Sequence, residues 1–346
     1  MSEEAEDASW DEFLQQIPTG QFQQSSIWAQ AKTSENWSCV RVLIGSEERL
    51  MGGFQLLWRS ALLGGIGYVS KGPVLERLDN QADTYLLEQY ATALLKKVAR
   101  RKKLHAVIVQ PPDHCEEMND LLREAGSMPE LHTRVNDATW IVDLSDGFDA
   151  VERGMSSSFR RNISRASRTN LRVWEGERSD LASFFELMLS SCRRQNVRPN
   201  PGNLRHLEAL WDAAHPRGAI RLYFVESDGE PITGHLDVLF GQTLTFWKKG
   251  WNGTAKRLAP NDVCVYEGLR WASEAGYSRC DFASFDRDMA VSLINGEALT
   301  EQQAHSRYLI FIRIGGRPML LPRAQVLLPN PLLRAGYRLR YSRQIH

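Results

Sequence analysis

The chain has 346 residues with 42 Lys and Arg against 42 Asp and Glu, so its formal net charge is zero. This length predicts two domains, and the balanced charge does not by itself argue for a nucleic-acid or membrane partner. We expect no DNA partner. No run approaches the roughly 18 apolar residues of a membrane span, and the acidic N-terminus is unlike a secretory signal, so we expect a cytoplasmic protein.

The C-terminal part of the sequence is distinctly basic. After Glu301 the chain has no acidic residue and eight arginines, which predicts a cationic surface. The five cysteines form no C-x-x-C pair, a pattern typical of reduced thiols, so we predict neither disulfides nor a metal site.

The first half predicts a helix, a strand meander and then a helix–strand unit. The helix spans 21–36, where Phe22, Trp28 and Ala31 supply an apolar face. The expected elements after it are strands 39–44, 51–58 and 66–69, helix 86–103, strand 104–110 and helix 116–125.

The second half repeats this order. Strand 140–144 and two helices precede strands 220–226, 232–240 and 242–251, helix 262–275 and strand 279–283. A meander followed by a crossover helix and a further strand describes a mixed sheet whose last pair is parallel. The sequence therefore predicts an α/β protein with two similar domains, each a mixed sheet flanked by helices.

One of the two helices, 156–172, is strongly basic. Arg161, Arg165, Arg168 and Arg172 recur at intervals of four, three and four, which would place them on one face. Guanidinium groups bind phosphate oxygens in pairs, so this stripe could hold a diphosphate, a transfer RNA backbone or anionic lipid. A solvated helix face is the alternative.

Two lysines in the first half are candidate substrate-binding residues. Lys32 follows Trp28 by one helical turn, and Lys71 lies in the glycine-rich segment 64–73, where it could meet an anion. The alternatives are a solvated lysine and a bent strand connection.

The second half carries the candidate catalytic residues. His235 and Asp237 alternate with apolar residues on one strand and would share a polar face, where a histidine could act as a general base or form a hydrogen-bonded pair. Asp281 ends the parallel strand, where such folds place ligands, although it could instead fix a turn. The further candidates for substrate binding are Arg194, Arg198, Lys248 and Trp251.

No nucleophile motif accompanies these residues. There is no G-x-S-x-G, and no cysteine lies in a catalytic pattern. This favours direct transfer between two bound substrates, which needs positioning, electrostatic support and a route for one proton.

Together, these segments resemble the FemAB family of peptidoglycan aminoacyltransferases within the GNAT-type acyltransferases. The segments that carry the resemblance are 24–32, 68–73, 140–145, 160–163, 260–276 and 279–282. The resemblance implies two GNAT-like domains, 1–138 and 139–304, and we expect the basic segment 305–346 to pack back on the first.

The resemblance also implies an activity. An amino acid delivered by aminoacyl-tRNA, or an acyl group from acyl-CoA, would be joined to a cell-wall or polysaccharide precursor, without a tightly bound cofactor. In the family a lysine and an arginine contact the precursor's diphosphate, which implies these roles for Lys32 and Arg194. Segment 252–260 departs from the glycine-rich pyrophosphate loop of acetyltransferases.

Two alternatives remain at this point. One is an acyl-CoA-dependent N-acyltransferase of exopolysaccharide biosynthesis, and the other is a non-catalytic binder of RNA or anionic glycolipid. The basic tail also predicts peripheral contact with the anionic inner membrane.

Overall fold

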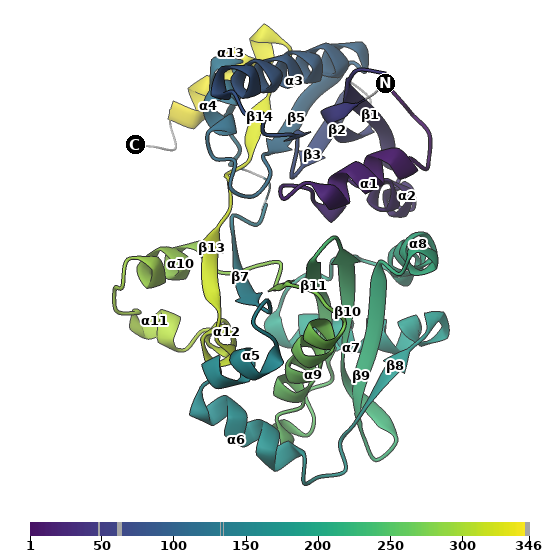
Figure 1. Ribbon diagram of the computed structural model, residues 1–346, viewed down its shortest axis with the longest axis vertical. Helices are drawn as coiled ribbons and strands as arrows, with labels where there is room; N and C mark the ends of the chain where they lie inside the picture. The colour runs from purple at the N-terminus through teal and green to yellow at the C-terminus, as the bar shows by residue number, and fades with distance from the viewer. Residues whose placement is uncertain (48, 61–63, 132, 134, 343–346) are drawn as a thin grey trace. The chain divides into compact units, whose positions relative to one another are not determined.

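The computed structural model describes residues 1–47, 49–60, 64–131, 133 and 135–342, and its chain forms two compact units (Figure 1). The first comprises Met1–Val135 and Leu321–His346, and the second comprises Asn136–Leu320. From the sequence we expected residues 305–346 to pack on the first domain. In the structure, residues 305–320 belong to the second unit and the chain re-enters the first unit at Leu321.

The first unit is built on a seven-stranded sheet of order β1-β2-β3-β5-β14-β6, with β4 paired to β2. Its strands are β1 (Ser38–Gly45), β2 (Leu50–Arg59), β3 (Gly65–Ser70), β4 (Val74–Leu75), β5 (Leu104–Gln110), β6 (Met128–Pro129) and β14 (Gln325–Leu327). Its helices are α1 (Ala8–Gln16), the short η1 (Phe22–Gln24), α2 (Ser26–Thr33), α3 (Gln81–Arg101), α4 (Met118–Glu124) and α13 (Pro331–Ser342).

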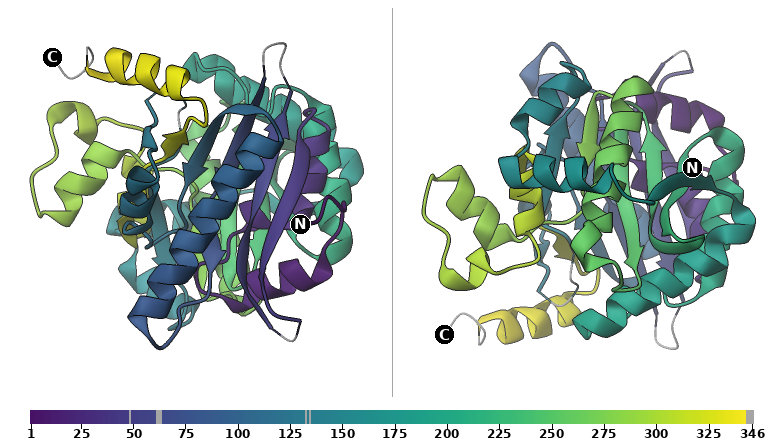
Figure 2. Two further views of the ribbon diagram at one scale, coloured as in Figure 1. Left: turned by 90° about the horizontal axis from the view of Figure 1, so that it is seen from above. Right: turned by 90° about the horizontal axis from the view of Figure 1, so that it is seen from below.

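The crossover helix α3 sets the direction of β5. The Asn80 side chain caps α3, and a buried apolar stripe that includes Leu87, Ala91 and Leu95 packs it across the sheet (Figure 2). The chain therefore returns parallel to β3, and the two strands pair from Gly65–Leu104 to Ser70–Gln110. This confirms the predicted meander, crossover and parallel pair.

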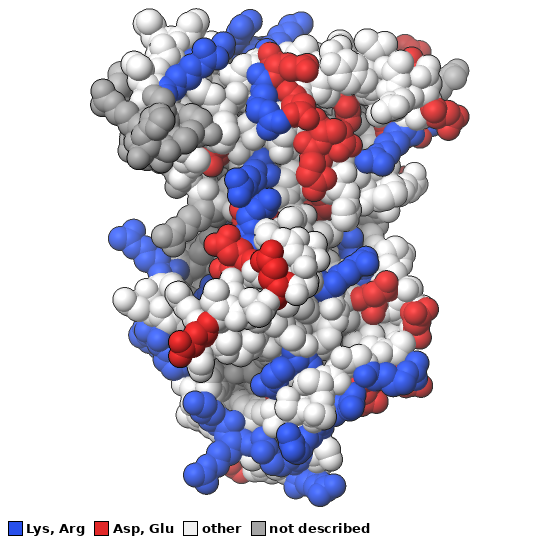
Figure 3. Space-filling view, turned by 90° about the vertical axis from the view of Figure 1, so that its left-hand side faces the viewer, with Lys and Arg blue, Asp and Glu red and all other residues white. Residues whose placement is uncertain are grey.

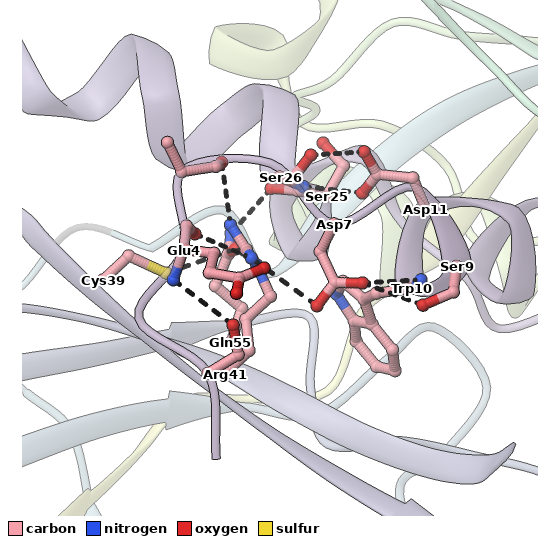
Figure 4. Close-up of polar contacts among 12 residues, drawn as sticks. Glu4, Asp7, Ser9, Trp10, Asp11, Ser25, Ser26, Cys39, Arg41 and Gln55 are labelled. Carbon is pink, nitrogen blue, oxygen red and sulfur yellow. Dashed lines mark hydrogen bonds and ion pairs between the residues drawn. The ribbon is translucent and has the colours of Figure 1, made fainter.

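A buried polar network holds the N-terminal segment against β1 (Figure 4). Arg41 has no exposed surface, and its guanidinium donates to the carbonyls of Glu4 and Ala5 and to Oε1 of Gln55. Nearby, the Asp11 carboxylate accepts hydrogen bonds from the backbone and the hydroxyl of Ser26. Charged groups this deep require such partners, so the network is part of the unit's framework.

The second unit has another seven-stranded sheet, of order β13-β7-β12-β11-β10-β9-β8. Its strands are β7 (Ala138–Asp143), β8 (Arg172–Gly176), β9 (Ile220–Ser227), β10 (Glu230–Phe240), β11 (Thr243–Trp251), β12 (Arg279–Asp281) and β13 (Arg317–Leu320). Its helices are α5 (Phe148–Gly154), α6 (Ser157–Ala166), α7 (Leu181–Gln195), α8 (Leu204–Ala214), α9 (Pro260–Glu274), α10 (Arg287–Ile294), α11 (Glu301–Ala304) and α12 (Leu309–Ile314), with short turns η2 (Arg178–Asp180), η3 (His215–Arg217) and η4 (Lys256–Leu258).

The second sheet repeats the topology of the first. Strands β9, β10 and β11 form an antiparallel meander, α9 crosses over, and β12 returns parallel to β11. The expected α/β architecture, with two mixed sheets flanked by helices, is confirmed.

The basic helix is shorter than predicted. It ends at Ala166, where the hydroxyls of Ser167 and Thr169 bond back to the carbonyls of Ser164 and Ala166. These local bonds compete with further helix, and the chain continues into the edge strand β8, which the sequence analysis missed. Arg168 therefore lies beyond the helix and Arg172 starts a strand, so the expectation of one continuous stripe is wrong.

Helix α13 lies on the first unit. The Tyr337 hydroxyl donates to the carbonyl of Pro129, and the Arg334 guanidinium donates to that of Leu328. Leu332 and Leu339 point outward and are 81% and 67% exposed. Within the described residues no helix has the length and apolar character to cross a membrane, and no group of His, Cys, Asp and Glu is arranged to hold a metal ion.

Candidate active site

The parallel strands β11 and β12 separate after a short pairing. They pair from Thr243–Arg279 to Thr245–Asp281, and beyond that β11 continues to Trp251 with only β10 beside it in the sheet. The chain after β12 instead stays with β7, because the N–H of Phe282 bonds to the carbonyl of Trp140. One edge of β11 is thereby left without a neighbouring strand.

The orientation of the backbone along this edge follows from Trp251. Its N–H donates to the Ser191 hydroxyl and its carbonyl accepts from that hydroxyl, so both groups point away from β10. Lys249 lies two residues earlier, and its N–H and C=O therefore face the same side. Within the described residues, no hydrogen bond is formed by the N–H or C=O of Lys249 on the side that faces away from β10. Ser191 already occupies both backbone groups of Trp251, so an extended chain that carries amide groups could pair with this edge at Lys249.

Lys249 also provides a cation with an unusual pKa. Lys249 is an exposed residue, and its ammonium lies 5.3 Å from the centroid of the Phe311 ring. Protein atoms around the ammonium displace part of its hydrating water, which lowers the pKa of Lys249 to about 8, and repulsion from Arg307 contributes in the same direction. The amine is thus mainly protonated at pH 7 and titrates one unit higher.

Arg194 lies at the C-terminal end of α7 and faces the end of β11. Its guanidinium donates to the hydroxyls of Ser190 and Ser191 and sits 4.7 Å from the Trp251 ring centroid. Burial, and then the neighbouring Arg193, lower the pKa of Arg194. The aromatic ring and the two hydroxyls hold the guanidinium in place while its charge is left uncompensated.

Arg307 completes this cationic cluster. Its guanidinium donates to Oε1 of Gln195, which is the residue after Arg194, at 2.6 Å. In the part of the chain that the structure describes, neither Arg194, Lys249 nor Arg307 forms an ion pair with a carboxylate. Lys249 and Arg307 repel each other electrostatically, and Arg194 precedes the residue that Arg307 bonds to. Cations without acidic partners favour an anion of two or more charges, such as a diphosphate.

The structure brings together some of the residues selected from sequence and separates others. Arg194 and Trp251 are in contact, whereas Arg198 lies in the exposed segment after α7 with no contact to either in the described structure. Lys248 has its ammonium 4.7 Å from the Trp247 ring centroid. Arg307 was missed, although its position in the acid-free tail was the available signal.

The two expected catalytic residues on β10 do share one face, but this face is buried. His235 is 2% exposed and Asp237 is not exposed, because Tyr223 and helix α9 cover them. Burial, and then Lys249, lower the pKa of His235 to about 3, and burial raises the pKa of Asp237 well above its ordinary value. His235 is therefore neutral at pH 7, and burial disfavours the charged form of Asp237. The face that these two residues share is enclosed by protein, and their catalytic role stays a prediction.

Asp281 makes the local contacts that fix a turn. Its carboxylate accepts hydrogen bonds from the Thr139 hydroxyl and from the N–H of Ala283, a residue with φ of 61°. These bonds hold the point at which the chain turns away from β11. The position at the end of the parallel strand agrees with the sequence analysis.

In the first unit, two sequence segments singled out as motifs meet at Gln24. Its side-chain amide donates to the carbonyl of Ser70 and accepts from the N–H of Gln55, each at 2.7 Å. A Cβ on Gly72 would come within 2.7 Å of the Gln24 side chain, so glycine is needed at that position. The start of α2 is thereby tied to the turn after β3.

The two candidate lysines of the first unit differ in their partners. Lys32 is partly exposed, bonds to Glu35 at 2.6 Å and lies 4.6 Å from the centroid of the Trp28 ring. Lys71 is buried in an ion pair with Asp113. Lys32 is thus the more accessible of the two.

Family models match both halves of the chain. Residues 5–131 match the FemAB family, and residues 157–288 match the acetyltransferase (GNAT) domain. These matches confirm the resemblance inferred from the sequence.

Individual relatives agree with the family models. The chain is 26% identical to the lipid II:glycine glycyltransferase of Staphylococcus haemolyticus over 243 residues, which are 66% of this chain and 55% of that protein. The chain therefore spans about half the length of the curated relatives that it matches. A crystal structure of FemX covers 98% of both chains with a TM-score of 0.78 at 17% identity. The C-terminal domain of a putative lysylphosphatidylglycerol synthetase from Agrobacterium fabrum shares the fold, with a TM-score of 0.54, 13% identity and coverage of 97% and 96%.

Proposed function

Since this chain belongs to the FemAB-type GNAT acyltransferases, we propose that it transfers an aminoacyl group from aminoacyl-tRNA to an amine of a peptidoglycan precursor. The observation that carries the proposal is the cationic cluster of Arg194, Lys249 and Arg307 beside the open edge of β11. Such precursors combine an anionic diphosphate with a peptide, and the cluster and the strand edge suit these two parts.

The proposed reaction is a direct transfer. The acceptor amine attacks the ester carbonyl of the aminoacyl-tRNA, an amide bond forms, and the ester bond to the ribose oxygen breaks. The amine gives up one proton and the ribose oxygen takes one, so no covalent enzyme intermediate is needed. The protein's part is to position both substrates and to stabilise negative charge on the carbonyl oxygen.

Within this proposal the candidate residues take different roles. Arg194, Arg307 and Lys249 bind the diphosphate, and Trp251 holds Arg194 in place. Lys32 is a separate candidate for phosphate binding on the first unit, and Lys248 and Arg198 are secondary candidates on the second. His235 and Asp237 act as positioning residues beneath Lys249, because His235 pairs directly across from Lys249 on the neighbouring strand. Asp281 and Lys71 fix turns.

The test is mass spectrometry of UDP-MurNAc-pentapeptide after incubation with the protein and charged transfer RNAs. We expect the mass of one amino acid to be added, and Arg194→Ala to reduce the yield. Arg178→Ala is the matched control, since Arg178 is an exposed arginine of the same unit that pairs with Asp212. If folded protein adds no mass to this precursor or to its lipid-linked form, the proposal is wrong.

The acyl-CoA alternative has one observation in its favour. The match to the acetyltransferase domain covers the separated β11–β12 pair, and the cationic cluster would also suit the diphosphate of coenzyme A. Adding common acyl-CoAs to the same assay separates the two donors, because the mass gained identifies the transferred group.

A further inference from the structure

A second basic surface of the second unit is formed by α6 and the turn η4, which are in contact with each other. From Arg153 to Arg172 the sequence has six arginines and no acidic residue, and segment 252–260 adds Lys256 and Arg257, again without an acid. Figure 3 shows Lys and Arg gathered at the lower end of the molecule, where Figure 1 places α6.

The packing of α6 directs its arginines to solvent. Phe159 and Ala166 are buried on one side of the helix, and the Asn162 amide donates to the Asp262 carboxylate on α9. Arg161 and Arg165 lie one turn apart on the opposite, exposed side. Arg160 differs, because it turns back and donates to the carbonyls at the end of α5.

The charges of this surface are not used within the protein. In the described structure no carboxylate pairs with Arg161, Arg165, Arg168, Lys256 or Arg257, and Arg165 bonds only to the neutral amide of Asn162. Several exposed, unpaired cations on one surface create a local positive potential in a chain whose net charge is zero. A polyanion is the partner that this arrangement favours.

The described residues of α6 and η4 include no large exposed apolar side chain, which favours RNA over a membrane as the partner of this surface. None of the large exposed hydrophobic residues of the described chain lies on α6 or η4, whereas α13 exposes Leu332 and Leu339. A helix that inserts into a membrane surface needs such residues, while a phosphate backbone needs only cations and donors.

We propose that the α6–η4 surface binds the phosphate backbone of RNA and so recruits the RNA that carries the donor. This inference rests on the proposed function for the identity of the RNA, but the binding itself does not require transfer. Because the contacts are to phosphates, recognition at this surface is independent of RNA sequence and weakens with salt.

The test is fluorescence anisotropy with a labelled, uncharged transfer RNA at several salt concentrations. The double variant Arg161→Ala/Arg165→Ala should bind about tenfold or more weakly, and its log–log salt slope should fall by about 2, one for each lost phosphate contact. The control Arg178→Ala/Arg270→Ala removes the same charge from exposed arginines that are paired with carboxylates, and it should bind as the wild type does.

Three outcomes would overturn the proposal. The α6 variant could bind RNA as tightly as the wild type does, or the control could lose as much affinity as the α6 variant. In a parallel assay with vesicles of phosphatidylglycerol and phosphatidylcholine, the α6 variant could lose its binding to the vesicles while it keeps its binding to RNA. The two proposals can fail separately. If the wild type transfers no amino acid but the α6 variant still binds RNA more weakly than the wild type, the proposed function is wrong and the RNA-binding surface is supported.

Discussion

The two units share a strand meander, a crossover helix and a parallel return strand, but they differ at the corresponding parallel strand pair. In the first, β3 and β5 pair along the whole of β3, from Gly65 to Ser70. In the second, β11 loses β12 after Thr245 and runs on to Trp251. A closed pair forms a continuous sheet, whereas a separated pair leaves backbone donors and acceptors that a ligand can use.

The units also differ in how they use arginine. Arg41 of the first unit is buried and saturated by protein acceptors, whereas Arg194 of the second is exposed and has no carboxylate partner in the described structure. An arginine is thus part of the framework where protein encloses it and is available to a ligand where it is exposed.

The largest effect is expected from Arg41→Ala. Removal of a buried guanidinium leaves the Gln55 side chain and two carbonyls without their donor, which should lower the free energy of unfolding by about 3 kcal/mol or more. Chemical denaturation measures this loss. Arg49→Ala, which breaks an exposed pair with Glu76, should cost less than about 1 kcal/mol. Equal costs would contradict the assigned framework role.

Arg194→Ala should act on binding and leave stability nearly unchanged. The loss of one charge-assisted contact to phosphate corresponds to about 1.5–3 kcal/mol, or at least a tenfold weaker affinity for UDP-MurNAc-pentapeptide. Isothermal titration calorimetry would measure the affinity and thermal melting the stability. A variant that melts much earlier but binds normally would place Arg194 with the framework residues.

Gly72→Ala tests the link between the two motif segments of the first unit. The new methyl group would collide with the Gln24 side chain, and the resulting shift should cost about 1–3 kcal/mol of stability. Gly218→Ala is a less suitable control because of its positive φ, so Gly154→Ala, where a Cβ meets nothing within 4 Å, serves instead. Similar melting of both variants would argue against the Gln24 contact.

The smallest effect is a pH dependence from Lys249. Because its pKa is lowered to about 8, the ammonium is charged at pH 7 and loses its proton as the pH rises through 8. Affinity for the precursor should therefore fall severalfold between pH 7 and 9, a window in which an ordinary lysine stays charged. Lys249→Met should bind more weakly at pH 7 and show a flatter profile. An unchanged wild-type affinity at pH 9 would exclude this role for Lys249.

Local sequence was sufficient to predict most elements and their order. The apolar periodicity of α3 and α9 and the short apolar strands after them determined the repeated unit, because each depends on the burial of its own side chains. The cationic character of α6 was equally evident, although its end at Ala166 depended on local hydroxyl bonds that compete with the helix.

The separation of β11 from β12 was decided only in three dimensions. Nothing in the sequence of β11 marks Thr245 as its last residue beside β12, because the separation depends on β7 holding the chain after Asp281. The burial of His235 and Asp237 also depends on tertiary packing. Their alternation with apolar residues predicted a polar face, but Tyr223 and α9 cover this face in the folded unit. Likewise, Arg307 bonds to Gln195, 112 residues away in the chain, and acts electrostatically on Lys249. A sequence determines periodicity and local propensity, whereas burial and distant partners arise when the elements pack.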